Sequence, residues 1–63
     1  MLTGKTIVLA VTGGIAAYKS ALIVRELKKR GAGVFVIMTR AAGEFITPLT
    51  LETLSRNPVA IET

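Results

Sequence analysis

Two adjacent glycines, Gly13 and Gly14, stand where an apolar run gives way to a helical pattern, in the stretch VTGGIAAYKS. The first N–H groups of a helix are unpaired and the helix dipole is positive there, so an anion is favoured at this position. Glycine has no side chain, which lets a phosphate group approach the backbone closely. The pair therefore predicts a phosphate site, although a tight turn that needs a positive φ would use the same residues.

Thr39 and Arg40 follow the next apolar run and provide a second polar position. A nicotinamide site that binds a ribose diol would have Asp or Glu there, whereas a hydroxyl and a guanidinium suit a phosphate. Because neighbouring parallel strands end at the same edge of a sheet, both loops are predicted to contact one phosphorylated ligand. The glycine segment TGGIAA matches neither the dinucleotide fingerprint nor the Walker loop. An NADP site remains open on these residues.

The residues suited to acid–base or metal chemistry are few. The chain has no histidine, no cysteine and only four glutamates. General acid–base catalysis usually needs a histidine or paired carboxylates, and zinc prefers histidine and cysteine ligands. We therefore expect no metal site and no catalytic residue in this chain, so that any chemistry comes from a cofactor or from residues elsewhere.

Apolar periodicity predicts the elements that would position these residues. TIVLAV is an unbroken β-branched run, which indicates an interior parallel strand buried on both faces. Gly31 is expected to end the first helix. The predicted elements are a strand at 6–11, a helix at 15–30, a strand at 33–38, a short helix within 39–46 interrupted at Gly43, a helix at 49–55 preceded by the cap Thr47-Pro48, a turn at Asn57-Pro58 and a third strand at 59–61.

The order of these elements predicts an α/β fold of Rossmann-like type with a parallel sheet. Sixty-three residues, 51% of them hydrophobic, are too few to cover both faces of such a sheet. We therefore expect residues 1–63 to form the first βαβα(β) portion of one incomplete domain, which packs against the remainder of that domain.

The basic balance of the chain, a net charge of +4, does not indicate a nucleic-acid partner. Its basic cluster, residues 28–30, is expected at a solvated helix end, where it suits the helix dipole. Its three aromatic residues are not interleaved with basic ones, as base stacking would require. The longest apolar run is too short for a signal peptide or a membrane span, so we expect a cytoplasmic protein without a membrane partner.

Two segments together resemble a known family. GKTIVLAVTGGIAAYKS and VIMTRAAGEFITPLTLETLS are similar to the N-terminus of bacterial phosphopantothenoylcysteine decarboxylases, within the flavin-containing cysteine decarboxylases. The resemblance covers nearly the whole chain, from about Gly4 to Val59. It implies a Rossmann-like flavoprotein fold, FMN as cofactor, a small-molecule substrate and a homo-oligomer built from trimers. Members often carry a fused phosphopantothenate–cysteine ligase.

The resemblance also implies roles for particular residues. Gly13, Gly14 and Ile15 would line the FMN site, and Thr39, with Arg40, would contact the phosphate or ribityl end. In the family, FMN oxidises a cysteine-derived thiol, carbon dioxide is lost and the enethiol is reduced. The family's catalytic histidine, asparagine and flap cysteine fall outside these 63 residues. A flavin prenyltransferase, a peptide cysteine decarboxylase and a non-catalytic βαβ binding module remain alternative readings.

Overall fold

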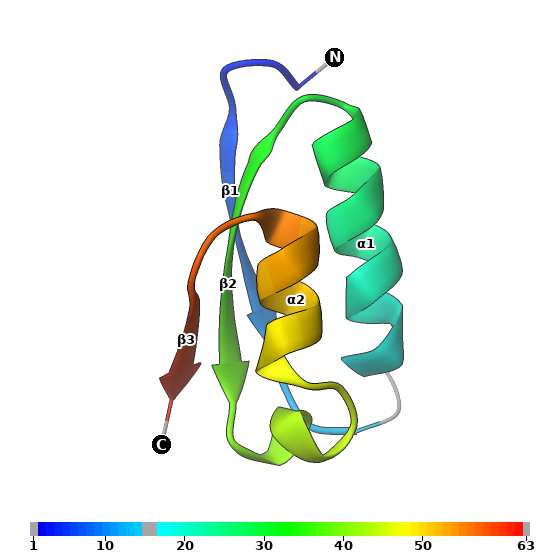
Figure 1. Cartoon of the computed structure of the whole chain (residues 1–63), viewed down its shortest axis with the longest axis vertical. Coiled ribbons are helices and arrows are strands. Elements are labelled where there is room, and N and C mark those ends of the chain that lie inside the picture. The colour runs from blue at the N-terminus through cyan, green and yellow to red at the C-terminus, as the bar shows by residue number, and fades with distance from the viewer. Residues whose placement is uncertain (1, 15–16, 63) are drawn as a thin grey trace.

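The computed structural model describes residues 2–14 and 17–62, which form a three-stranded parallel sheet with helices packed against it (Figure 1). The sheet order is β1-β2-β3, so each strand pairs with the next strand in the chain. The elements are β1 (Thr6–Val11), α1 (Ala17–Lys29), β2 (Gly33–Thr39), the 3-10 helix η1 (Ala41–Glu44), α2 (Pro48–Ser55) and β3 (Val59–Glu62). The predicted α/β, Rossmann-like fold is confirmed.

Local sequence signals explain most of the helix ends. Gly31 follows α1 with a φ of +89°, the left-handed conformation predicted for it. Thr47 caps α2, because its hydroxyl accepts a hydrogen bond of 3.2 Å from the backbone N–H of Thr50, and Pro48 is the first helical residue. The predicted start of the first helix at Ile15 lies outside the described residues.

The segment after β2 differs from the prediction. We expected a short helix interrupted at Gly43, but η1 runs through this glycine as a single 3-10 turn. The N–H of Gly43 donates to the carbonyl of Arg40, and the N–H of Phe45 donates to that of Ala42, at 3.1 and 2.9 Å. A 3-10 helix of four residues can contain a glycine, because it is a single turn and does not continue into a second one.

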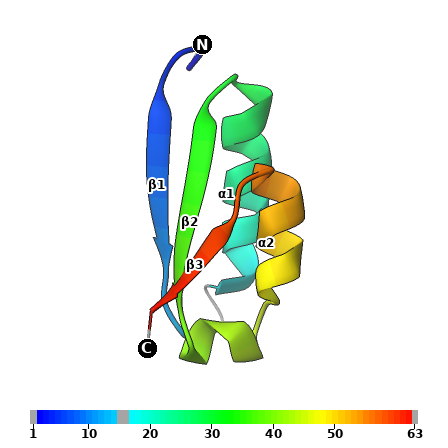
Figure 2. The same cartoon turned by 60° about the vertical axis from the view of Figure 1, so that its left-hand side comes forward.

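The helices cover only one face of the sheet, so the molecule has two layers (Figure 2). Along β2, Val34, Val36 and Met38 are buried beneath the helices, whereas Phe35 and Ile37 between them point to the other face. Phe35 is 44% exposed, and its neighbour in register, Val8 on β1, is 61% exposed. The prediction that the strands are buried on both faces is therefore wrong for this chain, because both helices lie on the same side.

The core lies between the sheet and the two helices. Its largest fully buried apolar side chains are Met38, Leu51, Val24, Val34 and Val36. None of the helices in the described part of the chain has the length and apolar character needed to cross a membrane. Since the strands are parallel, β1 and β2 end at one edge of the sheet, here called the carboxyl edge, which lies at the bottom of Figure 1.

Candidate functional site

The candidate site is formed at the carboxyl edge by two connections. One is the glycine loop, residues 12–14, which follows β1; the other is η1, which follows β2 (Figure 1). The structure brings both loops to the same edge, as predicted from the parallel order of the strands. Gly13, Gly14, Thr39 and Arg40 all lie on these two connections or directly beside them. Ile15, the fifth predicted site residue, lies outside the described residues.

Gly13 is the point of contact between the two connections. A Cβ built on Gly13 would lie 3.0 Å from the Cβ of Ala41, the first residue of η1. Ordinary contacts of such atoms are about 3.4–4 Å. The absence of a side chain at residue 13 therefore lets the glycine loop pack directly against η1. Sequence reasoning missed Ala41, although the small residues of TRAAG are consistent with a close approach.

Gly14 differs from Gly13 in both conformation and surroundings. Its φ is +112°, which side-chain-bearing residues rarely adopt, and its carbonyl accepts a hydrogen bond of 3.0 Å from the N–H of Ala17 at the start of α1. A Cβ built on Gly14 would meet no described atom within 4 Å. The backbone thus turns into α1 beside open space, which is the geometry required for the close approach of a ligand.

Thr39 connects the end of β2 to η1. Its hydroxyl oxygen accepts a hydrogen bond of 3.2 Å from the backbone N–H of Ala42, and its side chain is half-buried. A hydroxyl that accepts one bond keeps its own proton for donation to a phosphate or ribityl oxygen. Thr39 therefore orders η1 and still offers a donor at the carboxyl edge.

Arg40 provides positive charge beside Thr39. Its side chain is exposed, and its backbone N–H donates to the carbonyl of Glu62 at 3.3 Å, which ties η1 to the end of β3. Within residues 2–14 and 17–62, no carboxylate lies within ion-pair distance of its guanidinium. The ion pair found among these residues joins Arg30 and Glu26. A guanidinium without a carboxylate partner among these residues, on the residue that follows the Thr39 hydroxyl, favours an anionic ligand.

Two aromatic rings brace the connections from the side of the helices. Tyr18 in the first turn of α1 meets Phe45, which follows η1, edge to face, with ring centroids 6.1 Å apart. Phe45 also packs against the core. Tyr18 remains largely exposed. Its contact with Phe45 holds the start of α1 near η1.

A narrow hollow extends from the glycine loop along β1. It has a volume of about 130 Å³ and is lined by Leu9, Ala10, Val11, Thr12, Ala17, Ser20 and Ile23. Thr12 places a second hydroxyl beside Gly13, a residue that sequence reasoning did not select even though it directly precedes the glycine pair. The hollow is mostly apolar, which suits the ring or chain of a ligand whose phosphate lies at the loops.

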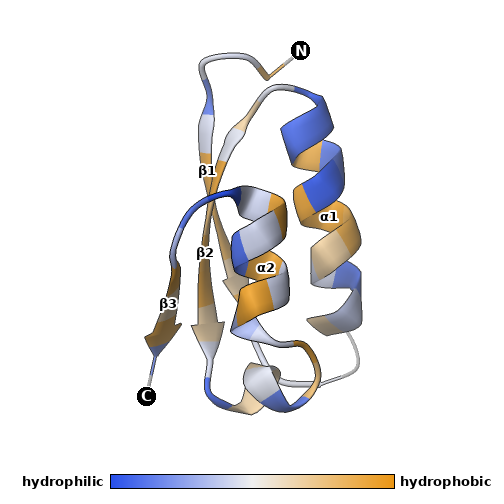
Figure 3. Cartoon of the chain, viewed as in Figure 1, coloured by the Kyte–Doolittle hydropathy of each residue, from blue (hydrophilic) through white to orange (hydrophobic). Residues whose placement is uncertain are grey.

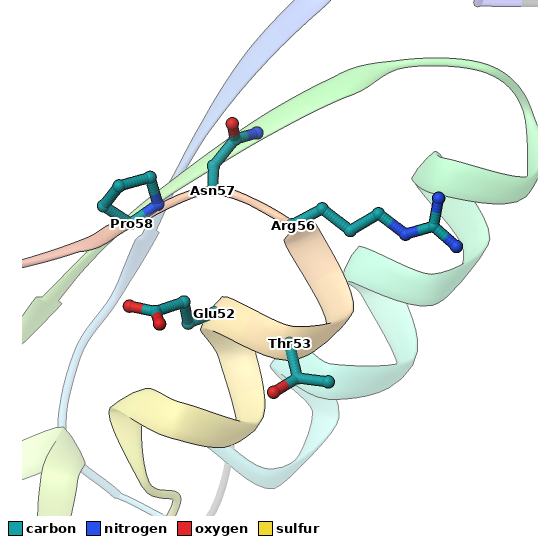
Figure 4. A pocket seen from close by; sticks show the side chains of 5 residues that line it. All are labelled: Glu52, Thr53, Arg56, Asn57 and Pro58. Carbon is teal, nitrogen blue, oxygen red and sulfur yellow. The ribbon is translucent and has the colours of Figure 1, made fainter.

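A second hollow lies at the opposite end of α2 and does not belong to this site. It has a volume of about 360 Å³ and is lined by Glu52, Thr53, Arg56, Asn57 and Pro58 (Figure 4). These residues end α2 and lead into β3, far along the sheet from the glycine loop. In the part of the chain that the structure describes, no three His, Cys, Asp or Glu side chains are grouped to hold a metal ion.

Comparison with known proteins identifies the family. The family model described as Flavoprotein matches residues 1–63, the whole chain. The chain belongs to the flavoprotein family. Membership implies a flavin as the cofactor.

Relatives within the flavoprotein family include enzymes of coenzyme A biosynthesis. The chain is 59% identical over 59 residues to the coenzyme A biosynthesis bifunctional protein CoaBC of Vibrio vulnificus, matching 94% of this chain and 15% of that protein. It is 58% identical over 55 residues to a probable phosphopantothenoylcysteine decarboxylase of Streptococcus mutans, matching 87% of this chain and 31% of that protein. The chain thus spans a minor part of the length of these relatives.

A solved structure shares the fold. The crystal structure of the cypemycin decarboxylase CypD superposes with a TM-score of 0.85 at 25% sequence identity, over 98% of this chain and 36% of that one. The three-stranded parallel arrangement is therefore found within a larger decarboxylase.

Proposed function

We propose that the chain forms part of the FMN site of a phosphopantothenoylcysteine decarboxylase, which converts phosphopantothenoylcysteine to phosphopantetheine in coenzyme A biosynthesis. The observation that supports this most directly is at the glycine loop: it packs against η1, and the Cβ position of its Gly14 faces open space. The 58–59% identity to CoaBC and to a probable phosphopantothenoylcysteine decarboxylase favours this substrate over a peptide or a prenyl donor.

The residues of the carboxyl edge suit the phosphate end of FMN. The open space at Gly14 admits a phosphate to the backbone near the N-terminus of α1, where the helix dipole favours negative charge. The Thr39 hydroxyl would donate to a phosphate or ribityl oxygen, and Arg40 would offset the charge of the phosphate. Ile15 would line the site next to the glycines. When bound, FMN supplies the electron transfer that the thiol chemistry requires, and these residues hold and orient it.

We also propose that residues 1–63 form the N-terminal part of one larger flavoprotein domain, whose remainder supplies the catalytic side chains. The open face of the sheet supports this, because Val8, Phe35 and Ile37 leave apolar surface exposed on a parallel sheet. The chain matches only a small share of the length of each relative, which agrees with this proposal. A cooperative thermal transition of residues 1–63 alone, as sharp as that of the full-length protein, would contradict this proposal.

The resemblance supports two further assignments. We propose a homo-oligomer built from trimers, which light scattering of the purified protein tests directly. We also propose a cytoplasmic location, as expected for an enzyme that makes a coenzyme A precursor.

The experiment that tests the cofactor site compares two glycines. Gly14→Asp in the full-length protein is expected to abolish flavin retention, because it places a carboxylate where a phosphate would approach. Gly4→Asp is the matched control: Gly4 also has a positive φ, +83°, and open space around its Cβ position, but it precedes β1 at the other edge. Both variants place a side chain at a positive φ that glycine adopts more readily.

The readouts separate the cofactor from the fold. Flavin absorbance per protein reports retention, mass spectrometry of the released cofactor distinguishes FMN from FAD, and far-UV circular dichroism reports folding. A folded Gly14→Asp variant with full flavin content would refute the site. Release of carbon dioxide from phosphopantothenoylcysteine tests the substrate, and a flavin-loaded protein without this activity would refute the assigned reaction.

A further inference from the structure

A hollow lined by four cationic side chains lies between the C-terminal ends of α1 and α2. It has a volume of about 340 Å³, and its lining, here called the basic hollow, consists of Arg25, Lys28, Lys29, Leu54 and Arg56. The C-terminal end of α1 is hydrophilic in Figure 3, and both helices run away from the carboxyl edge, so that their C-terminal ends point away from the glycine loop. The proposed flavin site does not use any of these residues.

The charge of the basic hollow exceeds what the helix ends can neutralise. Each helix C-terminus corresponds to roughly half a negative charge, so the two ends offset about one of the four positive charges. Among residues 2–14 and 17–62, the ion pair that forms is Arg30 with Glu26, at 3.5 Å, and it involves no side chain of the hollow. Figure 4 shows Glu52 pointing away from the Arg56 side chain, which extends toward α1. Among the described residues, the side chains of the hollow therefore have no carboxylate within ion-pair distance, and the helix ends offset only about one of the four charges.

Arg56 occupies a backbone position where glycine is usual. It follows α2 with a φ of +63° and a ψ of +26°, and its N–H donates to the carbonyl of Glu52 at 2.8 Å. A residue with a Cβ is strained in this conformation, which glycine adopts freely. Strain of this kind is a reason to look for a role of the side chain. Here the side chain of the strained residue extends toward α1 (Figure 4).

We propose that the basic hollow binds a small oligophosphate anion, such as the phosphate chain of a nucleoside triphosphate or inorganic polyphosphate. Two arginines and two lysines line one concave surface, and this concentration of positive charge suits several linked phosphates. A nucleic acid is disfavoured, because the cations form one cluster and none of the three aromatic residues lines it. An acidic peptide is disfavoured because Leu54 is the single apolar residue in the lining, which leaves little to recognise a side chain.

The test is a calorimetric titration of the full-length, flavin-loaded protein with tripolyphosphate, with ATP and with a hexaglutamate peptide at equal ionic strength. Loading with flavin keeps the phosphate probes out of the carboxyl edge. We expect saturable binding of tripolyphosphate or ATP, and binding of hexaglutamate at least about tenfold weaker. Tighter binding of ATP would indicate a nucleotide, and equal binding would indicate inorganic polyphosphate. Hexaglutamate binding as tight as that of the phosphates would overturn the proposal.

Arg56→Gly is the decisive variant, because it removes the guanidinium while relieving the backbone. A lost charge-assisted contact is expected to weaken tripolyphosphate binding about tenfold or more, with the urea midpoint unchanged or raised. Arg25→Gln should act in the same direction through the other guanidinium. Lys19→Gln is the matched control, since it removes one exposed positive charge from the opposite end of α1. Unaltered binding in a stable Arg56→Gly variant, or an equal loss in Lys19→Gln, would overturn the assigned site.

Discussion

The contact between Gly13 and Ala41 gives the sharpest test of how the candidate site is assembled. In Gly13→Ala, the new methyl group would lie 3.0 Å from the Cβ of Ala41, inside the ordinary contact range. Overpacking of this kind costs about 1–3 kcal/mol, of which a reduced entropy of the unfolded chain returns about 0.4–1 kcal/mol. The φ of Gly13 is not in the left-handed region, so the substitution adds no backbone strain of that type. We expect a net loss of about 0.5–2 kcal/mol in the free energy of unfolding.

A second substitution separates this clash from any other effect. With the Ala41 Cβ removed, the nearest remaining atoms of that residue are its carbonyl carbon and oxygen, at 3.6 and 3.8 Å, which is ordinary contact. Ala41→Gly alone should cost about 0.5–1 kcal/mol through backbone entropy. The double variant Gly13→Ala/Ala41→Gly should therefore be more stable than the sum of the two single losses predicts. The expected coupling is about 1–2 kcal/mol, measured by urea denaturation followed by circular dichroism.

The unsubstituted protein, the two single variants and the double variant also show whether this packing matters for the cofactor. If the two connections must pack at this distance to hold a flavin, Gly13→Ala should lower the flavin content and the double variant should recover most of it. Additive losses of stability, or a double variant no better than Gly13→Ala, would show that residues 13 and 41 do not press on each other. The packing account of the site would then be wrong.

Two further substitutions test neighbouring contacts. Thr39→Ala should weaken flavin binding about tenfold or more, since it removes both the cap on Ala42 and a donor of about 1.5–3 kcal/mol, while Thr39→Ser should retain most of the affinity in a flavin fluorescence titration. Equal losses in both variants would point to the methyl group instead. Asn57→Ala removes the bond of 2.8 Å from the side-chain amide to the carbonyl of Val34. It should lower the free energy of unfolding by about 1–3 kcal/mol, and an unchanged urea midpoint would show that this bond does not hold β3 in place.

The sequence allowed most of the fold to be predicted, because the decisive signals are local. An unbroken β-branched run, a glycine after the first helix and the Thr47-Pro48 cap each act within a few residues, and all three elements are found where expected. The third strand is predicted at 59–61 and extends to Glu62, an ordinary difference at a strand end.

Burial and loop contact could not be predicted in the same way, because they depend on how elements meet in space. Phe35 is as apolar as its neighbours, and its exposure follows from the placement of both helices on one face. The sequence indicated that both glycines matter but not that they differ in role. Gly13 packs against η1, whereas Gly14 forms a turn beside open space. The left-handed conformation of Arg56 was also missed, since no glycine or asparagine marks that position.

The neighbour-to-neighbour order of the strands determines when the candidate site is assembled during synthesis. β1 and β2 pair with each other, and the glycine loop and η1 belong to this first pair. The residues of both connections are therefore synthesised before β3, whereas the hydrogen bond from the N–H of Arg40 to the carbonyl of Glu62 forms only when β3 joins the sheet. Chains generally fold from the N-terminus as they are made, and contacts close in sequence form quickly. The final position of η1 at the carboxyl edge therefore depends on β3, the last of the three strands to be made.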